Sequence, residues 1–280
     1  MKGWDPDVPI EKKRRQLAML ATDDDAGVQD RKFVTAIGRA FEILRAFRPG
    51  EGALGNSELS SATGLPKATV SRLTHTLTRL GYLNYLDAAG KYEPSPSILA
   101  LGYCVLSNLR VRELTRDYMQ QLGDLAGTSV GLAGRDRLSM IYVAMSNGSP
   151  LRTMRHDIGT RVAIETSAIG RAFLAGITKE ERNYFYGHFA RTHGPVWGTL
   201  KGRIEDCIGQ VADRGFCLVD GEWQRDTRAV AAPIVSPDGN TVLAMNCVAP
   251  AFQISVEALE NDVGPRLAHL CRGLAPMMGG

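Results

Sequence analysis

The sequence has few cysteines, and none lies in a spacing that a disulfide framework or a zinc site would use. The five cysteines are scattered, odd in number and without a Cys-x-x-Cys pair: Cys104, Cys207, Cys217, Cys247 and Cys271. This argues against disulfide cross-links and a zinc knuckle, and for the reducing cytoplasm as the compartment. No His or Cys cluster has the spacing of metal ligands either, so we expect no metal and no cofactor.

Long apolar segments are also missing. No run of about 18 or more apolar residues occurs, so we expect no membrane span and no membrane partner. The N-terminal MKGWDPDVPIEKKRRQ has no apolar segment behind its charges, which excludes a secretory signal. What remains is a chain of 280 residues with 44% hydrophobic and 22% charged residues. Such a chain is typical of a globular protein with two domains.

The usual enzyme motifs are absent too. We find no Gly-x-Ser-x-Gly, no His-Glu-x-x-His and no phosphate-binding P-loop. His188 and His193 are five residues apart and would not share a helix face, and Gly194-Pro195 beside them suggests a loop. We therefore expect no catalytic residues and do not expect an enzyme.

The first third of the chain predicts a compact helical unit with a hairpin. Residues 1–32, which mix EKKRRQ with DDD, are expected to form a mobile arm. Apolar residues then recur at helical intervals up to Pro49-Gly50. Two further helices, 57–63 and 67–80, are separated only by the break at Gly64-Leu65, with Pro66 at the first turn of the second. Runs 82–86 and 91–93 around the turn signal at 87–90 predict a β-hairpin.

The helix expected over 67–80 has two different faces. Its apolar arc consists of Val70, Leu73, Leu77 and Leu80, and the opposite face carries Ala68, Ser71, Arg72, His75 and Arg79, flanked by Lys67, Thr69 and Thr76. Small and hydrogen-bonding residues let a helix approach base edges in the major groove, and Arg can bind guanine in a bidentate way. The short break before it places the preceding helix across it, as in a helix-turn-helix with a wing.

A solvated amphipathic helix of any three-helix unit is the alternative. The net charge of +3 does not by itself indicate a nucleic-acid binder. Residues 33–95 carry seven basic and five acidic side chains, a net charge of only +2. The order helix, helix, turn, helix, hairpin nevertheless favours DNA binding over a protein-binding module.

The rest of the chain predicts a mixed α/β domain. We expect helices over 97–109 and 111–126, strands over 129–133 and 139–144, helices over 166–176, 178–186 and 203–214, strands over 215–219, 229–235 and 241–249, and a last helix over 255–274. The domain boundaries predicted from this pattern are 1–32 for the arm, 33–95 for the winged helix-turn-helix, 96–110 for a linker helix and 111–280 for the second domain.

With these motifs in view, the chain resembles the IclR family of transcriptional regulators over roughly residues 33–275. The resemblance is carried by FVTAIGRAFEILRAF, SELSSATGLPKATVSRLTHTLTRLGYL, KYEPSPSILALGY, GTRVAIETSAIGRAFLA and RGFCLVDGEWQRDTRAVAAPI. The segment LVDGE…TRAVAAP resembles the branch that includes regulators of aromatic-acid and β-ketoadipate breakdown.

The resemblance implies an α+β protein of two domains, a winged helix-turn-helix followed by a GAF-like α/β effector-binding domain. It implies a homodimer or dimer of dimers that binds a palindromic double-stranded DNA operator and represses or activates in response to a small organic acid. By position, Lys67, Ala68, Thr69, Ser71, Arg72, His75, Thr76 and Arg79 would contact DNA, with Arg39 and Lys91 as weaker phosphate contacts.

The family's effector-facing positions fall on Met154, Ser167, Ala168, Asp220, Arg228, Ala229 and Asn246. Ser167 and Ala168 would open a helix whose amides can receive a carboxylate, and Arg228 could add a charge-assisted bond. The chain departs from the family at Ala163, where a proline is common, and at Ala229, where Ser or Cys is common. The loss of a polar atom at Ala229 makes the site more apolar, and Tyr142 and Trp223 could add aromatic surface. An alternative is a second domain that only oligomerises.

Overall fold

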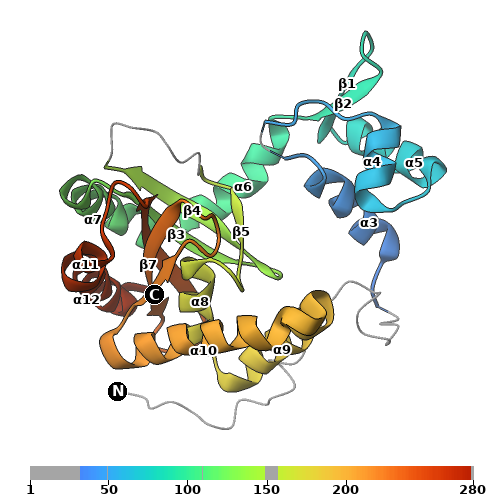
Figure 1. The fold of residues 1–280 in the computed structure, drawn as a ribbon. Coiled ribbons are helices and arrows are strands. Elements are labelled where there is room, and N and C mark those ends of the chain that lie inside the picture. The colour runs from blue at the N-terminus through green and yellow to red at the C-terminus, as the bar shows by residue number, and fades with distance from the viewer. Residues whose placement is uncertain (1–31, 49, 109, 149–156, 279–280) are drawn as a thin grey trace. The chain divides into compact units, whose positions relative to one another are not determined.

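A computed structural model describes residues 32–48, 50–108, 110–148 and 157–278. The chain divides between residues 108 and 109 into two compact units. The N-terminal unit consists of helices with one small hairpin, and the C-terminal unit is built on a curled six-stranded sheet with helices on both faces (Figure 1). This confirms the predicted fold class.

The N-terminal unit contains the expected winged helix-turn-helix. Its elements are α3 (Thr35–Arg45), α4 (Asn56–Thr63), α5 (Lys67–Arg79), β1 (Leu83–Leu86), β2 (Lys91–Pro94) and α6 (Ser97–Asn108). Figure 1 shows the β1–β2 hairpin projecting from the helices as a wing. Its core consists of Ile43, Leu59, Val70, Leu77 and Leu83.

The break between α4 and α5 follows from three local features. Gly64 ends α4 in the left-handed region at φ 69°, which favours glycine. The Ser60 hydroxyl donates to the carbonyl of Leu65 at 2.6 Å and so tightens the turn. Pro66 caps the start of α5 with its fixed φ of −56°. The two helices therefore meet without a flexible connection.

The apolar arc of α5 differs from the prediction at its end. Leu80 is 64% exposed, because α5 ends at Arg79 and Leu83 of the hairpin enters the core instead. Thr74, which was not expected inside, is fully buried, and its hydroxyl donates to the carbonyl of Val70 at 3.0 Å. A buried hydroxyl is tolerated when it is hydrogen-bonded in this way.

Part of the apolar surface of the N-terminal unit faces outward. Two residues of the apolar pattern predicted for α3, Ile37 and Phe41, are more than half exposed, whereas Ile43, which lies outside that pattern, is buried. The other large apolar side chains exposed on α3, its preceding turn and α6 are Phe33, Val34, Leu99, Leu101 and Tyr103. In the unit by itself these helices leave an apolar face uncovered.

The C-terminal unit begins with α7 (Arg110–Ala126) and is organised by one antiparallel sheet. The strands are β3 (Ser129–Asp136), β4 (Ser139–Asn147), β5 (Arg161–Ala163), β6 (Cys217–Asp220), β7 (Thr227–Val235) and β8 (Val242–Pro250), in the order β5-β4-β3-β8-β7-β6. Strand β5 was not predicted, because three residues give too little pattern.

Helices cover both faces of this sheet. Helices α8 (Ala168–Gly176), α9 (Lys179–His193) and α10 (Trp197–Arg214) belong to one face. Helix α7, α11 (Val256–Ala258), the π-helical turn η2 (Leu259–Val263), α12 (Gly264–Leu274) and the 3-10 turn η3 (Ala275–Met278) belong to the other. Alternation along β7 sends Val230 and Ala232 to the α12 face and Ala229 and Ala231 to the α8 face.

The expectation for residues 178–196 was partly wrong. Helix α9 runs on to His193, and the 3-10 turn η1 (Gly194–Val196) leads straight into α10, which begins at Trp197 rather than Arg203. The Thr178 hydroxyl and Glu181 form a capping box that starts α9 firmly. Within the described ranges no helix is long and apolar enough to span a bilayer.

Candidate DNA-binding surface and effector cavity

The predicted DNA contacts on α5 form one accessible surface. The eight residues are Lys67, Ala68, Thr69, Ser71, Arg72, His75, Thr76 and Arg79. Thr69 is half-buried, and the other seven are exposed. They are held from behind by Val70, Thr74 and Leu77, which are buried against the other helices. The helix therefore presents short side chains and cations on a rigid support, as groove insertion requires.

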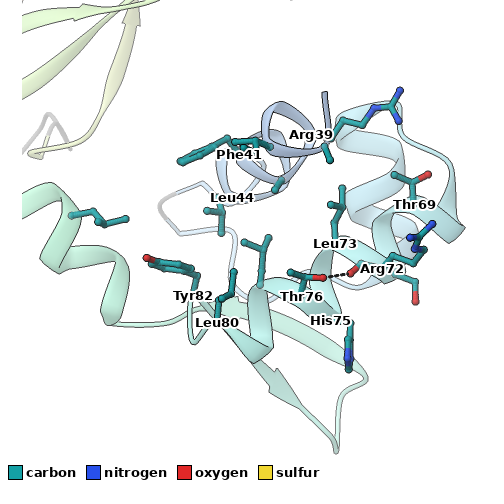
Figure 2. A pocket seen from close by; sticks show the side chains of 16 residues that line it. Arg39, Phe41, Leu44, Thr69, Arg72, Leu73, His75, Thr76, Leu80 and Tyr82 are labelled. Atoms are coloured by element: carbon teal, nitrogen blue, oxygen red, sulfur yellow. Dashed lines mark hydrogen bonds between the residues drawn. The ribbon is translucent and has the colours of Figure 1, made fainter. Parts of the chain in front are cut away.

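The structure shows how Thr76 and Arg72 on this surface can form hydrogen bonds with a ligand. The Thr76 hydroxyl donates to the carbonyl of Arg72 at 2.9 Å, so Thr76 faces a ligand as an acceptor. Figure 2 shows this bond, with the guanidinium of Arg72 directed away from the helix axis. Arg72 is thus placed to donate to a base edge or a phosphate.

The two weaker candidates differ from each other. Arg39 on α3 is exposed and lies beside the α5 residues along one groove (Figure 2). Lys91 at the start of the wing forms an ion pair with Glu58 of α4, Nζ to Oε1 at 2.9 Å. The backbone N–H of Gly55 and then Lys91 lower the pKa of Glu58, which keeps this carboxylate charged beside the lysine. A phosphate contact by Lys91 would have to compete with Glu58.

The C-terminal unit contains a small enclosed cavity against the α8 face of its sheet. Its walls are Tyr142, Val162, Ser167, Ala168, Val219, Trp223, Thr227, Ala229, Asn246 and Val248. Its volume is about 20 Å³, close to the space of one water molecule. The described residues that line it carry hydroxyl, amide and indole groups but no charged side chain.

A buried polar pair defines one wall of the cavity. The Asn246 side-chain amide donates to the Tyr142 hydroxyl at 3.1 Å, and both residues are less than 5% exposed. Burial raises the pKa of Tyr142 to about 12, so the phenol is neutral and can donate. Gly131 makes room for the pair, because a Cβ there would lie 2.4 Å from the Tyr142 ring.

The start of α8 forms another part of the cavity wall. The Ser167 hydroxyl caps this helix by accepting from the backbone N–H of Gly170 at 3.2 Å, and it donates to the carbonyl of Ala163 at 2.5 Å. Ser167 and Ala168, two of the predicted effector contacts, line the cavity. The first backbone N–H groups of a helix lack intrahelical partners and favour a negative charge. The cavity therefore joins an anion-favouring wall to a phenol and an amide.

Two of the predicted effector contacts do not reach the cavity. Arg228 and Asp220 are register partners on β7 and β6, on strand positions that alternate with the cavity residues Ala229 and Val219. The Arg228 guanidinium bonds Asp220 at 2.9 Å and the carbonyls of Ala251 and Ile254 at 2.9 and 3.0 Å. These contacts give Arg228 a structural role in holding the segment after β8.

Of the other predicted effector contacts, Ala229 and Asn246 line the cavity, and Met154 lies outside the described residues. Tyr142 and Trp223 contribute the aromatic surface that the sequence suggested. Sequence reasoning missed Val162, Val219, Thr227 and Val248. Strand alternation could have found two of them, because Thr227 is two residues from Ala229 and Val248 is two residues from Asn246.

The segment that carries Trp223 is anchored by a buried arginine. Arg171 of α8 is fully buried and forms a bidentate ion pair with Glu222, at 3.1 and 2.6 Å. Arg203 adds a third contact to Glu222 at 3.2 Å. Burial by itself raises the pKa of Glu222, but the guanidiniums of Arg171 and Arg203 outweigh it and lower the pKa overall. Glu222 thus fixes the residue next to Trp223.

Two sequence profiles cover most of the chain. Residues 36–87 match the IclR helix-turn-helix domain, and residues 103–271 match the bacterial transcriptional regulator IclR C-terminal domain. The described residues include no cluster of three or more side chains that could hold a metal ion.

Known proteins are similar along nearly the whole chain. The HTH-type transcriptional regulator TsaQ1/TsaQ2 of Comamonas testosteroni is 29% identical over 92% of this chain and 94% of its own. The Pca regulon regulatory protein of Pseudomonas putida is 26% identical over 90% of this chain and 86% of its own.

Solved structures share the fold. An IclR family transcriptional regulator from Brucella abortus superposes with a TM-score of 0.80 at 43% identity, over 89% of this chain and 95% of its own. An IclR homolog from Microbacterium hydrocarbonoxydans, in complex with 4-hydroxybenzoate, has a TM-score of 0.67 at 18% identity, over 86% and 97%. The chain therefore belongs to the IclR family of bacterial transcriptional regulators.

Proposed function

We propose that this chain is a cytoplasmic regulator whose operator binding is controlled by a small organic acid, in the first instance an aromatic one. The observation that carries the proposal is the chemistry of the cavity, where a helix start faces a neutral phenol and an amide. A carboxylate would accept from the N–H groups that open α8. A ring hydroxyl or carbonyl would bond Tyr142 or Asn246, with Trp223 beside the ring.

The cavity must enlarge to admit such a ligand. Its volume of about 20 Å³ holds one water molecule, whereas a benzene-sized ligand needs on the order of 150 Å³. Residues 223–226, which follow the anchored Glu222 and carry Trp223, are the part of the wall that we expect to move, while Arg171 and Arg203 hold Glu222 in place. A ligand that binds only the opened arrangement changes the populations of two states, which is the requirement for an allosteric effect.

On DNA, we propose that two copies place their α5 helices in successive major grooves of a palindromic operator. Support comes from the apolar face that α3 and α6 leave uncovered, since a second copy would bury it. The helix α6 would then transmit a change in the C-terminal unit to the spacing of the two recognition helices. Half-sites about 34 Å apart are expected for such a dimer.

The relatives motivate the choice of ligand. The M. hydrocarbonoxydans homolog binds 4-hydroxybenzoate, which has both a carboxylate and a ring hydroxyl. We therefore expect hydroxybenzoates to be informative first probes. The small cavity favours a second candidate, in which the C-terminal unit binds no ligand and only oligomerises.

A thermal-shift screen against about a hundred carboxylic acids separates the two candidates. A ligand that binds only the folded chain raises the free energy of unfolding by about 2.7 kcal/mol at a hundred times its Kd, and this raises the melting temperature. We expect an aromatic acid to give such a shift in the wild type, and a smaller one in Tyr142→Phe. A screen without any shift at millimolar concentrations would favour the oligomerising role.

A further inference from the structure

Two cysteine thiols lie against each other beside the start of α8, and the proposed effector cavity includes neither of them. Cys207 of α10 and Cys217 of β6 are 2% and 0% exposed. The two thiols hydrogen-bond each other. Sγ of Cys217 also lies 3.7 Å from the carbonyl oxygen of Ala168, the first residue of α8. The fold therefore brings together two sulfur atoms from a helix and the strand that follows it.

A buried guanidinium lies beside one of these sulfur atoms. Nη1 of Arg171 donates to Sγ of Cys207 at 3.7 Å and to Oε1 of Glu222 at 3.1 Å. Arg203 contacts the same carboxylate at 3.2 Å. Two positive groups thus face one carboxylate, and the guanidinium of Arg171 is next to Cys207. A thiolate at Cys207 would balance the remaining positive charge.

The surroundings of the two thiols differ in their effect on ionisation. The hydrogen bond from Cys217 lowers the pKa of Cys207, burial opposes it, and the charge of Arg171 lowers it further. The pKa of Cys217 is raised by its hydrogen bond to Cys207 and by burial. Burial also raises the pKa of Cys247 to about 12 and raises that of Cys271. Cys207 therefore ionises first among the buried cysteines, and the thiolate is the nucleophilic form.

The ion pairs beside Cys207 extend to the surface of the unit. The side chains of Glu222 and Arg203 are 23% and 55% exposed. Cys247 and Cys271, by contrast, lie in the hydrophobic core on the other face of the sheet. We therefore expect a small polar reagent to reach Cys207 before it reaches these two cysteines.

We propose that Cys207 is a modification site for small hydroperoxides, and that Cys217 resolves the product into a disulfide. The Cys207 thiolate attacks one peroxide oxygen. An S–O bond forms and the O–O bond breaks, which gives a sulfenic acid and releases hydroxide or alkoxide. Cys217 then attacks the oxidised sulfur. The S–S bond forms, and the sulfenic oxygen leaves as water with the Cys217 proton. The thiol pair loses two electrons, and the peroxide gains them. This reaction is separate from effector and operator binding.

Hydrogen peroxide tests the site in the full chain carrying Cys104→Ser, a change that removes the exposed thiol. A disulfide between Cys207 and Cys217 joins the tryptic peptides 204–214 and 215–225, and a reductant separates them. We expect mass spectrometry to show this linked pair forming at least about tenfold faster than any oxidation of the other two buried cysteines. In urea, where the fold is lost, the four thiols should oxidise at similar rates.

Two variants test the order of the steps. Cys217→Ser should stop at the sulfenic acid, which dimedone traps at Cys207, and Cys207→Ser should protect Cys217. Circular dichroism verifies that each chain is folded before peroxide is added. The proposal is overturned if the linked peptides do not form in the folded chain, or if all four thiols oxidise there at one rate. It is also overturned if the selectivity persists in urea, or if dimedone labels Cys217 in one variant as fast as Cys207 in the other.

Discussion

Arg72 is the residue of the proposed DNA-binding surface whose role in recognising the operator sequence we would test first. Its guanidinium is exposed on α5, and Thr76 leaves it unobstructed by bonding the Arg72 carbonyl instead. If Arg72 binds a guanine edge, Arg72→Ala should cost about 1–3 kcal/mol in operator binding and relax specificity at one position. Fluorescence anisotropy with operator and single-base variants measures both.

Lys179→Ala serves as the control for this change. Lys179 is an exposed cation at the start of α9, in the other unit, and its removal should leave operator affinity unchanged. If Arg72→Ala instead loses the same affinity on every DNA sequence, and the slope of log affinity against log salt concentration falls by about one, Arg72 binds a phosphate rather than a base.

Tyr142 and Arg228 were both candidates for the effector site, and the structure separates them. Tyr142→Phe removes a hydroxyl at the cavity wall and should weaken binding of a hydroxybenzoate about tenfold, the effect of one hydrogen bond. Isothermal titration calorimetry measures this loss.

Arg228→Ala should act on stability rather than on binding. The guanidinium donates to the carbonyls of Ala251 and Ile254, so its loss should lower the free energy of unfolding by about 2 kcal/mol. Effector affinity of the folded variant should remain within a factor of about two of wild type. A selective loss of binding with unchanged stability would return Arg228 to the effector site.

Glu222 gives the stability of the C-terminal unit a pH dependence. Its pKa is lowered in the folded chain, so its contribution is present above the ordinary carboxyl pKa of about 4.5 and is lost as the pH falls through the lower folded value. Glu222→Gln should cost about 3 kcal/mol at pH 7, because Arg171 remains buried. Measured by urea unfolding, the free energy of unfolding should fall less steeply from pH 7 to pH 3 for Glu222→Gln than for the wild type. Parallel declines would contradict the assignment.

At the scale of elements, the turn between α4 and α5 determines whether the recognition helix is correctly placed. Gly64 has a positive φ, and Gly187 lies exposed on α9, where a Cβ meets no atom within 4 Å. Gly64→Ala should therefore destabilise the chain by about 1 kcal/mol and weaken DNA binding. Gly187→Ala should be neutral or slightly stabilising. Thermal unfolding compares them, and equal effects would exclude a special role for this turn.

A comparison of the predicted with the observed elements shows which features can be predicted from the sequence. Helix α5 and the wing were predicted almost to the residue, because Gly64, Pro66 and the turn at 87–90 are strong local signals. Leu80 was misplaced because the tertiary competition with Leu83 has no local signature. Strand β5 is too short to show alternation. In the cavity, the family positions suggested that both Arg228 and Ala229 contact a ligand, but neighbouring residues on β7 point to opposite faces of the sheet, so only one of them can line the cavity.

At the scale of the whole molecule, recognition and sensing are assigned to different units. The exposed cations of α5 belong to one, and the enclosed polar cavity belongs to the other. Under the proposed function, control of one by the other requires that the effector prefer one of two arrangements, and opening of the closed cavity would supply that preference. Coupling of about 1–3 kcal/mol, or roughly 5- to 150-fold in affinity, is the usual range.

The most direct test of this account is the operator affinity of the full chain with and without a bound acid. DNA selected from a random library by the wild type is titrated by anisotropy, at zero and at saturating concentration of the acid that gives the largest thermal shift. We predict a change in the operator Kd of at least about fivefold at saturation. At one subsaturating concentration of acid, the change should be smaller for Tyr142→Phe than for the wild type. An identical Kd with the acid demonstrably bound would contradict the central claim that the cavity controls DNA binding.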